Sequence, residues 1–445
     1  MNTAGVASTT HNVEYALEKY QMLRYEANAQ VKIVMTSGTA EIFGTELVCG
    51  TDLVLQEGER GTVVTFHGCK ITVKGLGLDA FVMDAVEDHD LLHVYMNIHA
   101  NLQEARKKAT EDQSRGPRVL VCGPENVGKS VLCRTLVNYA ARRGSKPILV
   151  DVNVGLNQVC IPSTIAALAV TKPYDLLEGW GLEEDPLVFC FGHLDPSANL
   201  NLFTEQASSN IVNQLAELVN IRSENDAKVF SSGCIIKMGG FSKTPEKKEA
   251  GLEAIRTTAA AFEVDIVLVI EDGFLSTFLQ EDLLKDVTII RLPRSSGAVN
   301  FNPKQSMRQR DLRISAYFHG ENFKRRLHPH HLKLSASEYT VYRVGSEAIP
   351  DALLPHGARD AEAETQSWRT PIALAVSRDA LKNRLLAVSQ ATEPEQIASS
   401  PVYGFVVVLS VAEDRTFFNV LSPSPELPPS CLLVASICYV DPEGT

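Results

Sequence analysis

The sequence predicts an α/β protein in which a central P-loop domain with a parallel sheet is flanked by an N-terminal β-sandwich and a C-terminal β-rich domain. Three features predict this arrangement: short β-rich runs at the start, apolar strands alternating with helices in the middle, and β-rich, proline-punctuated sequence at the end. A chain of 445 residues is also too long for one hydrophobic core. We therefore expect domains at residues 1–98, 99–316 and 317–445.

The N-terminal prediction depends on β-rich runs separated by glycine-containing turns, at residues 31–35, 62–66 and 69–73. Such spacing is typical of a small antiparallel sandwich. A charged stretch at residues 99–112 favours a helix and ends at residues 115–117, which we interpret as a linker. The β domain is therefore expected to end before this helix.

The central part alternates apolar strands with helical segments, as expected for a parallel sheet covered by helices. The β-rich pattern returns after residue 317, with a polar stretch at residues 356–367 that we interpret as a surface loop. The predicted strands of the central sheet are residues 118–122, 148–152, 233–237, 264–270 and 287–292.

Composition and charge exclude several functional classes. The net charge of −12 argues against a protein whose whole surface binds nucleic acid, so any RNA contact is expected to be local or indirect. The nine cysteines never form a CxxC pair, which indicates reduced thiols, no disulfide-linked partner and no zinc site. We find neither a secretory signal nor an apolar run of about 18 residues, so the sequence predicts an intracellular protein without a membrane partner.

The strongest local signal is a full GxxxxGK(S/T) motif between an apolar strand and a helix. Glycines let backbone N–H groups close around phosphate oxygens, and the helix N-terminus adds a favourable potential. Lys129 is expected to neutralise the β and γ oxygens, and Ser130 to bind Mg²⁺ through its hydroxyl. The motif predicts a nucleoside triphosphate with Mg²⁺ but does not choose ATP over GTP. The candidate binding residues are Gly123, Asn126, Val127, Gly128, Lys129, Ser130 and Val131.

A second polar strand end follows at Asp151 and Asn153. Because side chains alternate along a strand, these two face the same side, next to the phosphate site. Either is a candidate for contacting the metal, the nucleotide or a substrate, and Asp151 is the candidate second Mg²⁺ ligand. The alternative is that Asp151 only caps a loop.

Ordered blocks along nearly the whole chain resemble a known family. The sequence is similar to the Clp/Grc-type polynucleotide 5′-hydroxyl kinases and, within them, to the eukaryotic ATP-binding subunit of the pre-mRNA cleavage factor. The resemblance implies three domains, ATP and Mg²⁺ as ligands, a nuclear role in RNA processing, and a scaffold subunit of the cleavage and polyadenylation factor as partner. The blocks that carry it are residues 40–47, 67–69, 116–119, 154–155, 161–162, 232–234, 261–265, 316–320 and 421–423.

Several positions depart from the pattern of the active kinases. The resemblance implies a carboxylate at the position of Asn153, which takes the proton from the RNA 5′-hydroxyl, and a glutamine at that of Leu156. An amide is a poor proton acceptor, and general-base catalysis typically contributes about 10²- to 10⁴-fold. Asp151 is the candidate substitute. The family's hydroxyl after the P-loop serine is Val131 here, and its base-stacking tryptophan corresponds to Phe241, which can still stack.

The lid departs further, because residues 300–307 contain no arginine where the kinases aim arginines at the transferring phosphate. A comparable arginine finger supplies about 10³ to 10⁵ in rate. Arg308, Arg310 and Arg313 follow directly and are candidates to compensate. Their helical spacing favours the alternative that they are solvated surface residues.

The resemblance also implies that the N-terminal domain holds the nucleotide base. The basic group of that site corresponds to Arg60, whereas the position of its acidic partner corresponds to Met22, which weakens the case for adenine selectivity. Without the resemblance, Arg60 would be interpreted as a solvated turn residue.

The sequence leads to a first hypothesis and two alternatives. We expect an ATP-binding factor in pre-mRNA 3′-end processing with weak or no kinase turnover, because phosphate-binding residues are retained and transfer residues are altered. The runner-up is an active ATP-dependent polynucleotide 5′-hydroxyl kinase acting on RNA, with Asp151 as base and Arg308 or Arg310 in the lid. A GTPase switch is disfavoured because the sequence contains no (N/T)KxD motif.

Overall fold

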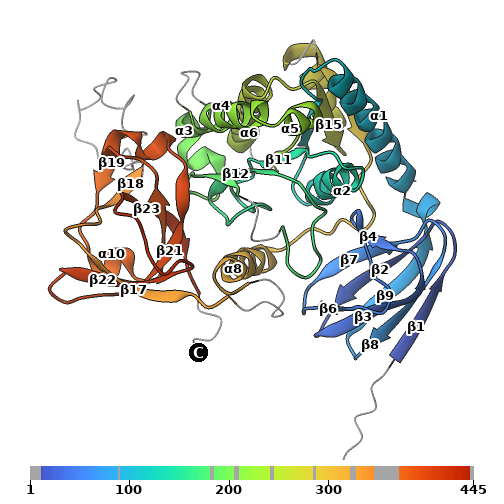
Figure 1. Ribbon diagram of the computed structural model, residues 1–445, viewed down its shortest axis with the longest axis horizontal. Helices are drawn as coiled ribbons and strands as arrows, with labels where there is room; N and C mark the ends of the chain where they lie inside the picture. Colours follow the sequence, from blue (N-terminus) through green and yellow to red (C-terminus); the bar gives the residue numbers. More distant parts are fainter. Residues whose placement is uncertain are drawn as a thin grey trace, which may run out of the picture.

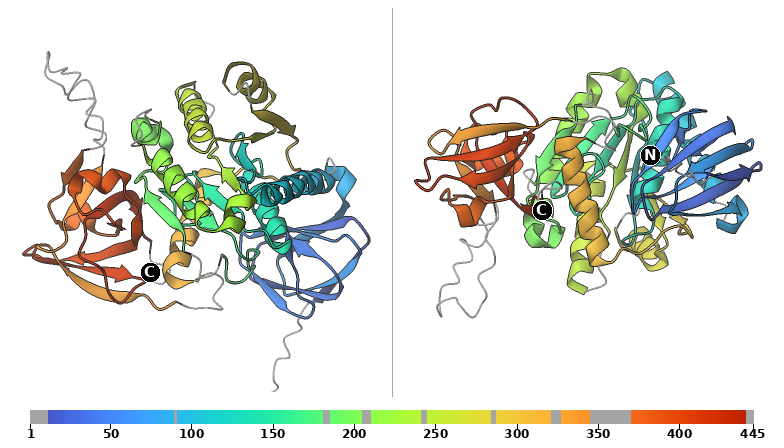
Figure 2. Two further views of the ribbon diagram at one scale, coloured as in Figure 1. Left: turned by 45° about the horizontal axis from the view of Figure 1, so that its top comes forward. Right: turned by 90° about the horizontal axis from the view of Figure 1, so that it is seen from below.

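Three domains lie in a row along the longest axis of the protein (Figure 1). The computed structural model describes residues 12–88, 91–180, 185–204, 210–240, 245–283, 287–320, 327–344 and 370–440. The central α/β domain separates the N-terminal β domain from the C-terminal domain, and Figure 2 shows the same order from two further sides. The predicted fold class is confirmed. No helix in the described part of the chain is long and apolar enough to cross a membrane.

The N-terminal domain is a sandwich of two sheets, with strand orders β1-β8-β3-β6 and β5-β4-β7-β2-β9. Burial alternates along its strands, so that in β6 Leu53 and Leu55 are buried and Asp52 and Val54 are not. This period of two gives each sheet one covered face, and the covered faces share a separate core. The strands are β1 (Asn12–Leu17), β2 (Gln21–Ala27), β3 (Val31–Gly38), β4 (Glu41–Ile42), β5 (Thr45–Glu46), β6 (Asp52–Leu55), β7 (Arg60–Val64), β8 (Cys69–Lys74) and β9 (Leu78–Asp84).

The central sheet has the strand order β13-β12-β11-β14-β10-β15-β16. Strands β11, β14, β10, β15 and β16 pair in parallel, whereas β12 and β13 extend the sheet in antiparallel fashion. Strands covered on both faces need continuous apolar sequence, and β10 is accordingly buried throughout. The strands are β10 (Arg118–Cys122), β11 (Ile148–Asp151), β12 (Thr164–Ala169), β13 (Leu187–Cys190), β14 (Cys234–Lys237), β15 (Ile266–Ile270) and β16 (Thr288–Leu292).

Helices cover the central sheet (Figure 1). On one face, Leu102 of α1 shares a core cluster with Leu132 and Leu136 of α2. On the other face, α4 and α6 pack against each other and contribute Leu215 and Ile255 to a larger cluster. The helices are α1 (Leu91–Glu111), α2 (Lys129–Arg142), α3 (Leu200–Thr204), α4 (Ile211–Glu224), α5 (Ala227–Ser232), α6 (Pro245–Ala261), α7 (Gly273–Phe278), α8 (Pro303–His319) and, in the C-terminal domain, α10 (Arg378–Leu381).

The C-terminal domain is built on a sheet with the order β17-β22-β21-β20-β23-β18-β19. It continues the core of the central domain, because Phe405 of β21 and Phe318 of α8 share one cluster with Phe189 of β13. The backbone N–H and the hydroxyl of Ser436 both donate to the carbonyl oxygen of Gly192, at 2.8 and 2.9 Å. The strands are β17 (His330–Ser335), β18 (Val341–Val344), β19 (Pro371–Ala373), β20 (Arg384–Ser389), β21 (Val402–Val411), β22 (Phe417–Ser422) and β23 (Leu432–Cys438).

Two helices run across the positions expected for the domain boundaries. Helix α1 begins at Leu91, ahead of the expected boundary at 98/99, and α8 continues to His319, past the one at 316/317. The backbone N–H of Phe405 donates to the hydroxyl of Tyr317, at 3.0 Å, so the end of α8 packs with the C-terminal domain. Leu92 of α1 shares a small core cluster with Met22 of β2, so both helices are shared between neighbouring domains.

The last turns of α2 hold the N-terminal domain through polar side chains. The buried carboxylate of Glu41 in β4 accepts hydrogen bonds from the Tyr139 hydroxyl and, at 2.6 Å, from Nη1 of Arg142. The side-chain amide of Asn138 donates to the carbonyl oxygen of Phe43 at 2.9 Å. We call Glu41, Asn138, Tyr139 and Arg142 the α2 seam. It fixes the angle between the β domain and the helix that carries the P-loop.

We expect Glu41→Ala to lower the free energy of unfolding by about 2 kcal/mol, because it removes a buried carboxylate and leaves the Tyr139 hydroxyl without its acceptor. Glu46→Ala is the matched control, since Glu46 also binds Arg142 but its side chain is 70% exposed. Its loss should cost less than about 1 kcal/mol. Urea unfolding followed by circular dichroism compares the two, and equal destabilisation would show that the seam carries no particular stability.

Candidate functional site

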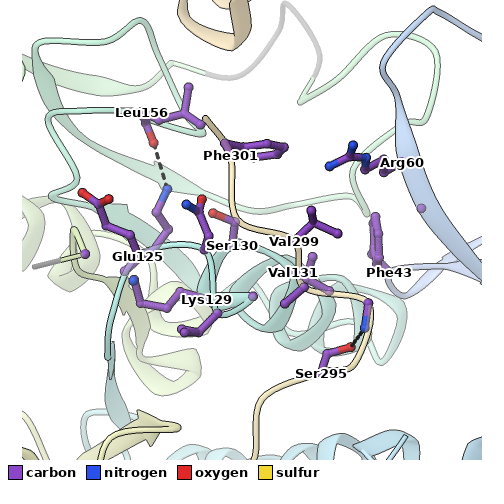
Figure 3. Close-up of a pocket in the computed structure, with 18 of the residues that line it drawn as sticks. Phe43, Arg60, Glu125, Lys129, Ser130, Val131, Leu156, Ser295, Val299 and Phe301 are labelled. Carbon is purple, nitrogen blue, oxygen red and sulfur yellow. Dashed lines mark hydrogen bonds between the residues drawn. The ribbon is translucent and has the colours of Figure 1, made fainter. Parts of the chain in front are cut away.

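A cavity of about 1170 Å³ lies between the N-terminal domain and the central domain. It is larger than the roughly 300–1,000 Å³ of most small-molecule sites, so it has room for a nucleotide and part of a second ligand. Its walls include β2 and β7, the P-loop and the start of α2, the loop after β11, the end of β14, and residues 295–301 between β16 and α8. We call residues 295–301 the bridging segment. Figure 3 shows Val299 and Phe301 of this segment facing Phe43 and Arg60 of the β domain.

The P-loop follows β10 directly and takes the backbone shape that the glycine motif predicts. Gly123 and Gly128 have φ angles of 138° and 99°, a region that favours glycine, and Asn126 adopts a φ of 58°. A Cβ atom on Gly123 would lie 2.6 Å from the carbonyl oxygen of Ile270, so a larger residue does not fit there. Asn126, Val127, Gly128, Lys129, Ser130 and Val131 all line the cavity.

Lys129 opens helix α2 and is 6% exposed. Its ammonium donates to the carbonyl oxygens of Gly123, at 2.9 Å, and Pro124. Burial, helped by the positive charge of Lys237, lowers the pKa of Lys129 to about 8. The positive charge of this ammonium and the helix dipole both favour an anion at the N-terminus of α2. The site is therefore suited to binding phosphate.

Asp151 ends β11 and is fully buried, outside the residues that line the cavity. Its Oδ1 accepts from the backbone N–H of Asn153 at 2.9 Å, and its Oδ2 from that of Gln158 at 2.7 Å. The ammonium of Lys237, itself 1% exposed, forms a salt bridge of 2.7 Å to Oδ2. Both carboxylate oxygens are engaged, so Asp151 as placed here does not fit the expected role of a Mg²⁺ ligand.

The other residues of the expected metal and base positions lie on the cavity wall. The side chain of Asn153 accepts a hydrogen bond from the backbone N–H of Gly155 at 3.1 Å, and both residues line the cavity with Leu156. Ser130, at the first turn of α2, is the one expected Mg²⁺ ligand that faces the cavity. In the ranges that the structure describes, no group of three or more His, Cys, Asp or Glu side chains could hold a metal ion.

The three arginines of α8 have different surroundings. Arg308 is exposed and forms a 3.5 Å ion pair with Glu57 of the β domain. Arg310 lines the cavity and donates from Nε to the carbonyl oxygen of Gly155 at 3.0 Å. Arg313 donates from Nε to the carbonyl oxygen of Cys160 at 3.2 Å. The expectation of solvated side chains therefore holds for Arg308 alone, because the loop after β11 offers carbonyl acceptors to the other two.

The wall formed by the β domain contains a charged pair and aromatic rings. Arg60 of β7 faces Glu26 of β2 across the ladder, and their side chains form an ion pair of 2.5 Å. The Arg60 guanidinium also lies 5.7 Å from the ring centroid of Phe301. Within the described part of the chain, its buried Nε and Nη1 atoms have no hydrogen-bond partner. Met22 is buried on the same wall, so the carboxylate beside Arg60 comes from Glu26, four positions further along β2.

The bridging segment is tied to the β domain by Arg24 of β2. Its guanidinium donates to the hydroxyls of Ser295, at 3.3 Å, and Ser296. A Cβ atom on Gly297 would lie 3.1 Å from this guanidinium, which leaves little room for a larger residue. The segment thereby closes one side of the cavity from the central domain to the β domain.

Sequence reasoning missed Lys237, Glu26 and Arg24, which all line the cavity. Lys237 ends an otherwise apolar strand, and a charged residue at that position is a signal that could have indicated a functional side chain. Glu26 and Arg24 had no local signal, because both lie on a strand remote from the P-loop in sequence. Phe241, the candidate for stacking on an RNA base, lies outside the described residues.

Three family models match the chain, each in one part of it. The model described as the N-terminal beta-sandwich domain of polyadenylation factor matches residues 16–109. The P-loop model of mRNA cleavage and polyadenylation factor CLP1 matches residues 123–320, and that of pre-mRNA cleavage complex II protein Clp1 matches residues 327–441. The chain belongs to the Clp1 family. The resemblance found in the sequence is confirmed by these matches.

Clp1 proteins from vertebrates match over almost their entire length. Those of Gallus gallus and Homo sapiens, each named polyribonucleotide 5′-hydroxyl-kinase Clp1, are 36% identical over 432 residues, which is 96% of this chain and 96% of theirs. The Clp1 protein of Xenopus laevis is 36% identical over 441 residues, 98% of this chain and 95% of its own. The curated members of the family are thus named as kinases, whereas the family models are described by cleavage and polyadenylation.

Two solved structures have the same fold. Wild-type Clp1p in complex with Pcf11p gives a TM-score of 0.78 at 20% identity, over 97% of this chain and 99% of that one. A structure of the extended interface between Pcf11p and Clp1p, which also addresses ATP loss in a point mutant, gives 0.77 at 19% identity over the same shares. At these identities the likeness supports the Clp1 fold and nothing finer.

Proposed function

We propose that this Clp1-family protein is an ATP-binding subunit of the nuclear machinery for pre-mRNA 3′-end cleavage and polyadenylation, with weak or no kinase turnover. One observation carries the proposal: the cavity combines a complete P-loop with transfer groups that are altered or engaged elsewhere. The family models, which describe cleavage and polyadenylation factors, support the process.

A purine nucleotide is favoured by what lies beyond the P-loop. Phosphates held at Lys129 leave the ribose and base directed toward the β domain, where Phe43, Arg60 and Phe301 line the cavity. Aromatic rings and a guanidinium face are suited to stacking on a purine. The solved Clp1p structure that addresses ATP loss in a mutant supports the choice of ATP.

We expect Lys129→Ala to abolish nucleotide retention, because it removes the buried ammonium of the P-loop. Lys146→Ala is the control, since Lys146 pairs with Asp226 outside the cavity. Nucleotide released by acid from each purified protein is quantified by ion-exchange chromatography. ATP should be recovered from the wild type and the control only, and equal recovery from Lys129→Ala would refute the assignment of this site.

Weak turnover is favoured by the state of the two candidate bases. The amide of Asn153 is a poor proton acceptor, and it already accepts from the backbone of Gly155. The carboxylate of Asp151 is buried against Lys237 and lies off the cavity wall, so it does not reach a substrate hydroxyl as it stands. Neither group supplies the general base that the transfer of a phosphoryl group to RNA requires.

The runner-up function, an active polynucleotide 5′-hydroxyl kinase acting on RNA, is favoured by one observation. Arg310 lines the cavity from α8, which is where a lid arginine would approach a transferring phosphate. Its Nε is bonded to the carbonyl oxygen of Gly155, so the guanidinium would have to leave this acceptor or share it. Arg308 pairs with Glu57 and does not line the cavity.

We expect Asn153→Asp alone to leave RNA 5′-phosphorylation far below ordinary kinase rates of roughly 1 to 100 s⁻¹. The substitution restores a carboxylate that can still accept from Gly155, but residues 300–307 still lack an arginine. Transfer from radiolabelled ATP to a 5′-hydroxyl RNA measures the rate, with Asn153→Ala as the control. A rate inside the kinase range for Asn153→Asp would show that the lid is sufficient.

The same reasoning suggests why the P-loop is kept. With little transfer chemistry, the remaining use of bound ATP is to stabilise the closed arrangement of the β and central domains, which form opposite walls of the cavity. A ligand that binds only this state stabilises it by RT ln(1 + [L]/Kd), about 2.7 kcal/mol at a hundredfold excess over Kd. We propose that a scaffold subunit docks on the arrangement that ATP holds, and the solved complex of Clp1p with Pcf11p supports a protein partner for this fold.

We therefore expect Lys129→Ala to weaken binding of the scaffold subunit in a pulldown, whereas Lys146→Ala should bind as the wild type does. Circular dichroism first establishes that both variants are folded, and nuclease treatment removes RNA. Undiminished scaffold binding by a folded, nucleotide-free Lys129→Ala variant would exclude the coupling while leaving the ATP site in place.

A further inference from the structure

Lys237 occupies an unusual place for a lysine, at the end of the strand between the P-loop strand and the Asp151 strand. In the parallel ladders it faces Val121 of β10 on one side and Asp151 of β11 on the other. Its side chain is 1% exposed yet forms part of the cavity wall. A buried ammonium is costly unless it is paired, so its position beside a phosphate site demands an explanation.

Among the residues that the structure describes, the ammonium has two acceptors. It forms the 2.7 Å salt bridge with Asp151 and donates to the carbonyl oxygen of Leu156 at 3.0 Å, a bond that is dashed at Leu156 in Figure 3. An ammonium has three donors, so one remains for a further ligand. The charge of Lys237 also acts on Lys129, which places the two ammoniums in one electrostatic environment.

This arrangement does not offer the ligands that a divalent cation needs. Mg²⁺ needs oxygen ligands in octahedral geometry and is usually held through one or two carboxylates together with the phosphates. Here the carboxylate at the end of β11 is neutralised by Lys237, and Glu125, which lines the cavity, is the acidic residue within the P-loop motif. Two buried ammoniums also repel a third cation between them, and this repulsion is strong where water is excluded.

We propose that Lys237, together with Lys129, neutralises the phosphates of bound ATP in place of a carboxylate-held Mg²⁺, so that nucleotide binding does not depend on a divalent cation. The proposal deepens the function proposed above, because it concerns the same phosphate site. Asp151 then holds Lys237 in position and is neither a metal ligand nor a base. The disagreement with the expected Mg²⁺ site follows from the residues that surround Asp151.

The test is nucleotide affinity with and without Mg²⁺, measured by fluorescence anisotropy with a labelled ATP analogue and protein freed of endogenous nucleotide. For the wild type, replacing excess Mg²⁺ by EDTA should change Kd by less than about threefold, because both positive charges belong to the protein. This measurement requires no variant. A loss of affinity of about tenfold or more in EDTA would overturn the proposal.

The variant Lys237→Gln provides a second test, by the same affinity measurement. The glutamine amide can still donate to Asp151 and Leu156, but it frees the carboxylate from its counter-charge. We expect binding in EDTA to be weaker than that of the wild type by at least about tenfold and to recover when Mg²⁺ is added. Lys146→Gln removes a comparable ion pair, to Asp226 at 2.9 Å, outside the cavity and should behave as the wild type does.

Each outcome has a distinct meaning. If Lys237→Gln is folded and binds in EDTA as tightly as the wild type, the Lys237–Asp151 pair is only structural and the proposal fails. If the wild type requires Mg²⁺, the proposal fails while the ATP site stands. If the wild type binds no ATP analogue in either condition, the proposed function fails and this inference fails with it.

Discussion

Helix α2 is the element on which both walls of the cavity depend. Its first residue, Lys129, faces the phosphate site, and its last turns carry the polar side chains that hold Glu41 of the β domain. A helix is stiff over this length, so the angle between the domains and the geometry of the P-loop are set together. Hydrophobic packing alone would allow the β domain to slide, whereas a buried carboxylate with fixed donors accepts one arrangement. The bridging segment also supports this arrangement, through its hydrogen bonds with Arg24.

Much of the central domain could be predicted because its parallel strands are continuous apolar runs, and β10 coincides with the predicted residues 118–122. The antiparallel extension was not predicted. Strand β12 has the sequence TIAALA, whose alanines favour helix as much as strand, and β13 is only four residues long. β12 becomes a strand because β11 offers it a partner, and β13 because β12 does, which is a tertiary effect that no local pattern contains.

The candidate site also has a part that the sequence predicted and a part that it did not. The P-loop was predictable because one contiguous motif specifies its backbone and its ligand chemistry. The partner of Asp151 was not predictable, because strand alternation gives the face of a side chain but not its partner, and Lys237 comes from a strand about 86 residues away in sequence. Likewise, helical spacing suggested solvated arginines on α8, whereas Arg310 and Arg313 find carbonyl acceptors in the loop after β11.

The shared core of the central and C-terminal domains has a consequence for synthesis on the ribosome. The N-terminal sandwich has a separate hydrophobic core and can fold as soon as its strands have emerged from the ribosome. The larger core runs from Leu120 to Tyr439, so the apolar side chains of β13 and α8 that pack on the C-terminal domain stay uncovered until nearly the whole chain is made. During that interval this exposed apolar surface is accessible to chaperones and to premature self-association. The order of the domains along the chain therefore makes the C-terminal domain the last part of this shared core to be synthesised.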